Sequence, residues 1–140
     1  MAKTTTLPIP QTLKTAPVTL VNADGTGWKT LYTAGAEGAV VRVFGATCDD
    51  TVAANLRIGV DPGTGTVYQK GCVNIPIGAG TTGSVPTVDC LASVIMPQQG
   101  MDQTFKRTLQ LGAGEVLKIA VLAAVGAGKV LTAMIELEEF

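Results

Sequence analysis

The sequence has no histidine and few charged residues, and both shortages narrow the functions open to it. Its 140 residues include 10 Lys and Arg and 11 Asp and Glu, which gives a net charge of −1. Histidine is the commonest general base and the commonest metal ligand in proteins. The basic residues are scattered, whereas binding to phosphates requires clustered Lys and Arg. We therefore expect that the protein is not an enzyme, that it binds no metal or cofactor, and that it makes no direct contact with nucleic acid.

Activated nucleophiles and paired cysteines are also missing. The two serines, Ser84 and Ser93, lie in neither a Gly-x-Ser-x-Gly nor a Ser-x-x-Lys motif, and no histidine can activate them. Cys48, Cys72 and Cys90 are odd in number and form no Cys-x-x-Cys pair. This pattern predicts reduced, buried thiols in a protein made in the cytoplasm.

No stretch of the chain reads as a membrane span or a signal peptide. The N-terminus lacks the apolar core of a secretion signal. The most hydrophobic stretch, residues 116–135, is interrupted by Lys118, Gly126, Gly128 and Lys129. It is typical of two strands joined by a turn, so we expect no contact with a membrane.

Two glycine-rich segments and one acidic pair resemble ligand sites only in part. Residues 59–65 and 126–130 do not match a phosphate loop; in the second segment, Ala123 stands in place of the first Gly and Val130 in place of the Ser or Thr. Both segments lie between predicted strands, so we interpret them as turns. Asp49 and Asp50 could contribute to a calcium site, but such a site needs six to eight oxygen ligands. A solvated turn is the favoured interpretation.

Alternating apolar residues recur along the chain at short intervals and predict β-strands. Val41 and Val43 would share one face of a strand, with Val40, Arg42 and Phe44 on the other. Clearer sets that would face the core are Leu56, Ile58 and Val60; Leu117, Ile119 and Val121; and Leu131, Ala133, Ile135 and Leu137. The spacing predicts an all-β domain over residues 17–140, a two-sheet β-sandwich or jelly roll of about eight strands.

The first 16 residues are rich in Thr and Pro and predict an extended N-terminal arm. Proline lacks a backbone N–H and restricts the residue before it, which disfavours regular pairing. Leu7, Ile9 and Leu13 supply apolar side chains that a free tail would not need. We expect this arm to contact a neighbouring subunit, with a disordered tail as the alternative.

Acidic residues gather at the C-terminal end. Glu136 and Glu138 are two residues apart, so they lie on one face of the last predicted strand, with Thr132 and Met134. A solvated strand face is the simpler interpretation. The alternative is a patch that forms salt bridges to a partner.

The order of turns and strands resembles that of a known class of small virion proteins. The segments that carry the resemblance are the turn 22–26, then 28–34, 38–43 and, near the end, 109–119. The chain from about Val18 to Leu137 is similar to head decoration (cement) proteins of tailed bacteriophages, which have a jelly-roll-like sandwich. That family carries no catalytic residues.

The resemblance implies a structural protein on the outer surface of the capsid, made in the bacterial host cytoplasm. Its partners would be the major capsid protein and further copies of itself. A homodimer is the first expectation for this self-association, and a trimer is the second. The alternative is a tail or fibre module that recognises a host receptor or glycan. Gln98, Gln99 and Asp102, beside Met101, are the nearest approach to a glycan site in the sequence.

Overall fold

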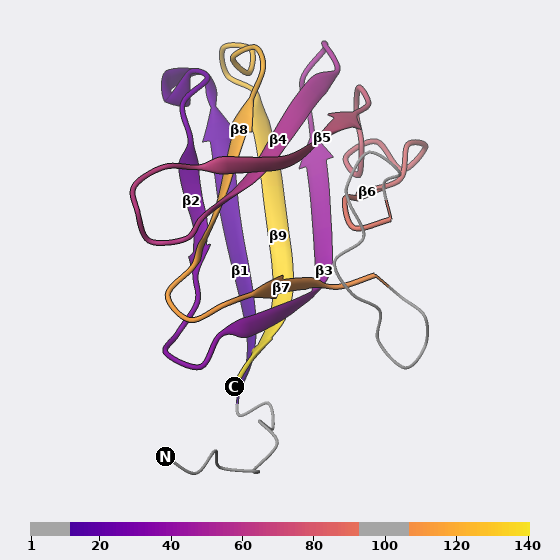
Figure 1. The fold of residues 1–140 in the computed structure, drawn as a ribbon. Coiled ribbons are helices and arrows are strands. Elements are labelled where there is room, and N and C mark those ends of the chain that lie inside the picture. The colour runs from indigo at the N-terminus through magenta and orange to yellow at the C-terminus, as the bar shows by residue number, and fades with distance from the viewer. Residues whose placement is uncertain (1–11, 93–106) are drawn as a thin grey trace, which may run out of the picture.

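The computed structural model describes residues 12–92 and 107–140 and shows an all-β fold with two antiparallel sheets (Figure 1). A short 3-10 helix, η1 (Asn22–Asp24), is the one helical element in these ranges. The nine strands are β1 (Thr12–Val21), β2 (Lys29–Thr33), β3 (Ala39–Cys48), β4 (Ala54–Asp61), β5 (Tyr68–Ile75), β6 (Val88–Asp89), β7 (Leu109–Leu111), β8 (Val116–Val121) and β9 (Val130–Glu139). The predicted two-sheet sandwich is therefore confirmed.

The strand order is that of a jelly roll. The first sheet has the order β1-β9-β3-β6, with β7 also paired to β3, and the second has the order β2-β8-β4-β5. The first strand, β1, pairs with the last, β9, and β2 pairs with β8. Nearer the middle of the chain, β3 pairs with β6 and β7, and β4 pairs with β5. The chain is thus a long hairpin rolled so that its strands alternate between two sheets.

The core lies between the sheets and consists of the inward members of the alternating sets. The residues predicted to face inward on β4, β8 and β9 are all buried, from Leu56 to Leu137. On β9 the intervening Thr132, Met134, Glu136 and Glu138 are half-buried or exposed, as predicted. Among the described residues, Phe44 is the largest fully buried side chain.

The predicted facing of β3 is wrong in its second half. Val41 and Phe44 are both buried, whereas Val43 is 45% exposed. The cause is a bulge, because the register of β3 against β9 shifts between Val41 and Val43. A bulge adds one residue to a strand and reverses the facing of every residue after it.

The boundary of the predicted arm also needs correction. Thr12–Ala16 belong to β1 and pair with β9 from Glu139 to Ile135, so this part of the arm lies in the sheet of its own chain. Pro17 sits within β1, opposite Met134. Leu7 and Ile9 lie outside the described residues.

Residues 93–106 lie outside the described part of the chain as well, and with them Gln98, Gln99, Met101 and Asp102. Strand β6 has two residues, after which the chain turns at Cys90–Ala92. In β7, Leu109 and Leu111 are buried.

Candidate interaction surface

The outer face of the first sheet brings together three of the residues predicted to bind a partner. Leu13 of β1 is opposite Glu138 of β9, and Thr15 is opposite Glu136. These residues line an open groove of about 290 Å³, together with Lys14, Arg42 and Leu137. Leu13, Glu136 and Glu138 therefore form one site, although Leu13 is more than 120 residues away from the two glutamates in the chain.

An ion pair lies in this groove. Arg42 of β3 places its Nη2 2.8 Å from Oε2 of Glu138, and that carboxylate oxygen is shielded from solvent without a well-aligned hydrogen bond. Arg42 faces outward next to the buried Val41, but its pairing with Glu138 depends on the register of β3 against β9, which the sequence pattern does not report. Glu136, one row further along the strand, is exposed.

Apolar side chains surround the groove on the same face. Leu13 is 78% exposed, Val43 45% and Met134 42%. Val43 is opposite Glu136, and Met134 lies between Pro17 and Gly45 in the neighbouring strands. A face that combines exposed apolar side chains with a few charges is typical of a protein–protein contact.

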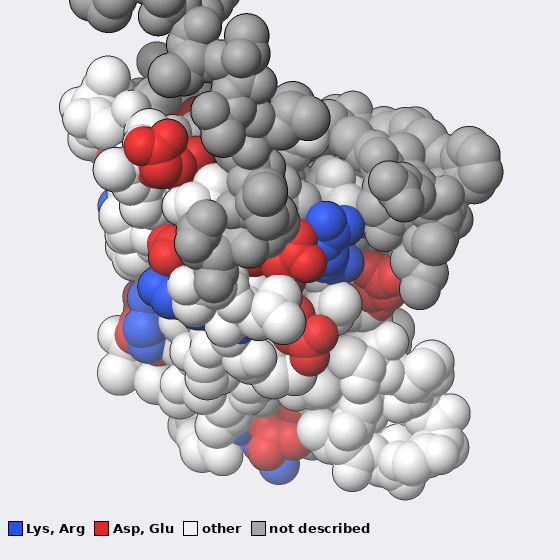
Figure 2. Space-filling model, turned by 90° about the horizontal axis from the view of Figure 1, so that it is seen from below, with Lys and Arg blue, Asp and Glu red and all other residues white. Residues whose placement is uncertain are grey.

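The end of the sandwich that carries the C-terminus mixes both signs of charge. Figure 2 shows acidic and basic side chains next to one another at this end, without a wide patch of one sign among the described residues. Lys14 Nζ lies 2.8 Å from Glu139 Oε2, and the Tyr32 hydroxyl donates to Glu139 Oε1. The hydrogen bond from Lys14 and then that from Tyr32 hold the pKa of Glu139 below its ordinary value. This cluster joins β1, β2 and β9.

The solvated turn predicted for Asp49 and Asp50 is wrong for Asp50, whereas Asp49 is exposed. Asp50 is buried, and its carboxylate accepts a hydrogen bond of 2.7 Å from the Gly126 N–H. Asp49 accepts one of 2.7 Å from the Val130 N–H. The Gly126 hydrogen bond is the main cause that lowers the pKa of Asp50. The pair fixes the loop between β8 and β9, and no cluster of metal-ligating residues occurs in 12–92 or 107–140.

The backbone N–H groups of the glycine-rich turn after β4 bind a carboxylate of the same chain. The Asp61 carboxylate accepts hydrogen bonds from the backbone N–H groups of Gly63, Thr64 and Gly65, at 2.8 to 3.2 Å. These donors, with Gly63 first, lower the pKa of Asp61. An external phosphate would have to displace this carboxylate. The turn is shorter than the predicted 59–65, because β4 continues to Asp61.

The three cysteines are free thiols. Cys48 and Cys90 are buried, whereas Cys72 is half-buried, which departs from the predicted burial of all three. Burial raises the pKa of Cys90 to about 12 and also raises that of Cys48. Neither of the two buried thiols is suited to nucleophilic chemistry at neutral pH.

The second sheet carries an aromatic platform that no local sequence pattern predicts. The Arg57 guanidinium lies 4.5 Å from the centre of the Trp28 ring, and its Nε donates to Gln69 Oε1 at 3.0 Å. A Cβ at Gly59 would lie 3.0 Å from the Trp28 ring, so the missing side chain lets the indole rest on the sheet. Trp28, Arg57 and Gln69 are too far apart in sequence for any local motif.

These features define a jelly-roll domain with two distinct outer faces. Comparison of the chain with protein-family models, curated proteins and solved structures found no match. Within the described ranges, no helix has the length and apolar character needed to cross a bilayer.

Proposed function

We propose that this protein is a structural virion protein that binds the outer surface of an assembled phage capsid and stabilises it. The observation that carries the proposal is the outer face of the first sheet, where exposed Leu13, Val43 and Met134 surround a charged groove. The major capsid protein would be its partner, and the protein would be made in the host cytoplasm and reside on the virion. It would act by binding and not by catalysis.

The mechanism is mass action. A protein that binds the assembled shell and not its free subunits stabilises the shell by RT ln(1 + [L]/Kd) per site, where [L] is the concentration of free protein. Many copies on one lattice allow each contact to be weak, particularly if the protein is itself a homo-oligomer. The mixed charges of the groove would orient the contact, and the apolar rim would supply most of its free energy.

Binding to capsids prepared without the protein tests this function. The double variant Val43→Asp and Met134→Asp places two carboxylates on the apolar rim, and we expect co-sedimentation affinity to fall at least tenfold, about 1.4 kcal/mol. Leu122→Asp is the matched control, because Leu122 is 58% exposed and follows β8 of the other sheet. If both variants bound capsids equally well, the outer face of the first sheet would not be the contact surface.

A second candidate is a tail or fibre module that recognises a host receptor or glycan. The Trp28–Arg57–Gln69 platform favours it, because aromatic, guanidinium and amide groups are frequent in recognition sites. Asn55 and Asn74, joined by a 3.2 Å hydrogen bond, add amides on the neighbouring strands β4 and β5. Loss of host-cell adsorption in Trp28→Ala, with capsid binding absent from the parent protein, would favour this candidate over the first.

A further inference from the structure

Strand β1 lies at the edge of the first sheet, and alternate residues direct their backbone N–H and C=O groups away from β9. Beyond the ends of the β3–β9 ladder, Asp49 N–H bonds to Val130 C=O at 3.2 Å and Phe140 N–H to Gly38 C=O at 3.3 Å. The backbone N–H and C=O groups of even-numbered residues in β9 therefore form hydrogen bonds with β3, and those of odd-numbered residues form hydrogen bonds with β1. Their partners in register on β1 are even-numbered, as in Lys14 opposite Leu137. The odd-numbered residues of β1 thus direct N–H and C=O away from the sheet.

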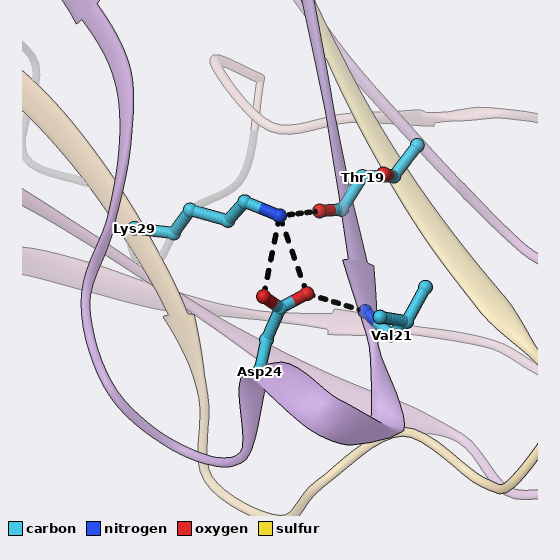
Figure 3. Close-up of polar contacts among 4 residues, drawn as sticks. All are labelled: Thr19, Val21, Asp24 and Lys29. Carbon is cyan, nitrogen blue, oxygen red and sulfur yellow. Dashed lines mark hydrogen bonds and ion pairs between the residues drawn. The ribbon is translucent and has the colours of Figure 1, made fainter.

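The second half of this edge is closed by side chains. Lys29 Nζ donates to the Thr19 C=O at 2.7 Å, and the Val21 N–H donates to Asp24 Oδ2 at 2.8 Å (Figure 3). Lys29 and Asp24 also form an ion pair of 3.3 Å. Pro17 has no N–H to offer. Another strand could not pair with β1 beyond this point, which is how natural sheets protect their edges.

The first half of the edge remains open. Leu13 and Thr15 direct their N–H and C=O groups outward, and no described residue bonds to them on that side. The Leu13 side chain is 78% exposed beside these groups. An unpaired strand edge next to an exposed apolar side chain is a surface for β-strand addition.

We propose that this open edge pairs antiparallel with the same edge of a second copy, so that the first sheets of two subunits become continuous. Leu13 of one copy would exchange two hydrogen bonds with Thr15 of the other, and the two-fold axis would pass beside Lys14. An antiparallel arrangement makes the edge its own complement, because each outward N–H faces an outward C=O. Leu13 would then cover Thr15 of the other copy, at the rim of the groove.

The charge of Lys14 fits this arrangement. Two lysines opposite each other at the axis would repel. Each Lys14 is held by Glu139 of its own chain at 2.8 Å, which offsets the repulsion. The proposal deepens the homo-oligomer part of the proposed function and rests on it. It concerns the isolated protein, so its failure would leave capsid binding untouched.

Proline substitution at the open edge tests the pairing. Thr15→Pro removes an outward N–H and leaves the bonds from β1 to β9 in place, as Pro17 already does. We expect sedimentation equilibrium to give twice the 14.3 kDa chain mass for the parent and a single chain mass for Thr15→Pro. Thr19→Pro is the matched control on the closed half of the edge and should remain dimeric. A parent that stays monomeric, or a Thr15→Pro dimer as tight as the parent, would overturn the proposal.

A cross-linking experiment covers the case in which Thr15→Pro does not fold. Residue 14 would face its own copy across the axis as a non-hydrogen-bonded pair, with Cα atoms about 4.5 Å apart, which suits a disulfide. In a Cys72→Ser background, Lys14→Cys should give a covalent dimer under mild oxidation. Thr19→Cys in the same background should not. Equal cross-linking of the two variants would contradict the register.

Discussion

Tyr32 of β2 donates its hydroxyl hydrogen bond to Glu139 of β9, and this contact joins the two sheets at the end where the chain terminates. Lys14 of β1 approaches the same carboxylate from the first sheet, at 2.8 Å. Burial, followed by the hydrogen bond to Glu139, raises the pKa of Tyr32, and the Glu139 hydrogen bond raises that of Lys14. One glutamate thus holds the open half of β1 against the rest of the sandwich.

Removal of the Tyr32 hydroxyl should weaken this end of the fold. We expect Tyr32→Phe to lower the free energy of unfolding by about 1 kcal/mol, because a partly buried hydrogen bond is lost. Tyr68→Phe is the control, since Tyr68 is 60% exposed. Urea denaturation followed by circular dichroism measures both, and an equal change in the two variants would argue against the Tyr32–Glu139 contact.

Acid should destabilise the protein through four carboxyl groups. Asp24, Asp50, Asp61 and Glu139 all have lowered pKa values in the folded state, the aspartates mainly through backbone N–H donors and Glu139 through Lys14. A lowered folded pKa gives stability that is present above the ordinary values of 3.8 and 4.5 and is lost as pH falls through the folded pKa.

The urea midpoint should therefore fall as pH decreases from about 5 to about 2. In Asp61→Asn the protein should be less stable at neutral pH and should lose less further stability on acidification. A pH dependence of Asp61→Asn as steep as that of the parent would mean that Asp61 does not titrate in this window.

Gly59 is required by the indole that lies over it. A Cβ at this position would lie 2.6 Å from Val67 Cγ1 and 3.1 Å from the Tyr68 carbonyl oxygen, as well as against the Trp28 ring. We expect Gly59→Ala to cost about 1 to 3 kcal/mol through overpacking. Gly27→Ala, with no heavy atom within 4 Å, is the control and should change stability by less than about 0.5 kcal/mol. Thermal denaturation of the two variants separates them.

The three thiols should react in two classes. Cys72 is half-buried and should react with a thiol reagent in the native protein, whereas Cys48 and Cys90 should react after unfolding, since burial raises the pKa of both. Titration in denaturant without reductant should return three thiols per chain, and Cys72→Ser should remove the fast class. A single thiol in denaturant would indicate a disulfide.

The fold could be predicted because it depends on local alternation. The inward sets on β4, β8 and β9 follow a period of two, and regular spacing of short strands indicates a sandwich. The bulge at Arg42 could not be predicted, because a bulge is set by pairing with another strand and has no distinct sequence pattern in a segment such as 39–44. The place of Thr12–Ala16 in β1 does not follow from the sequence, because the prolines of this segment disfavour regular pairing, although an edge strand tolerates proline where the N–H would point outward.

Local sequence patterns predict the residues of the candidate surface but not that they lie together. They place Leu13 in an N-terminal arm, and Glu136 and Glu138 on one face of the last strand. Their meeting in one groove depends on the register of β1 against β9, which links residues more than 120 positions apart. The same holds for Arg42 with Glu138 and for Trp28 with Arg57. Cross-sheet and cross-strand neighbours are fixed by topology, which local periodicity does not report.

In the function that we propose, the protein binds an assembled capsid through the outer face of its first sheet. Cryo-electron microscopy of particles made without the protein, before and after addition of the purified chain, would show this contact. We predict added density on the outer surface of the head shell, with the face that carries Val43 and Met134 toward the shell and the Trp28–Arg57 platform away from it. Density confined to the tail, or a head shell unchanged at saturating protein, would contradict the claim.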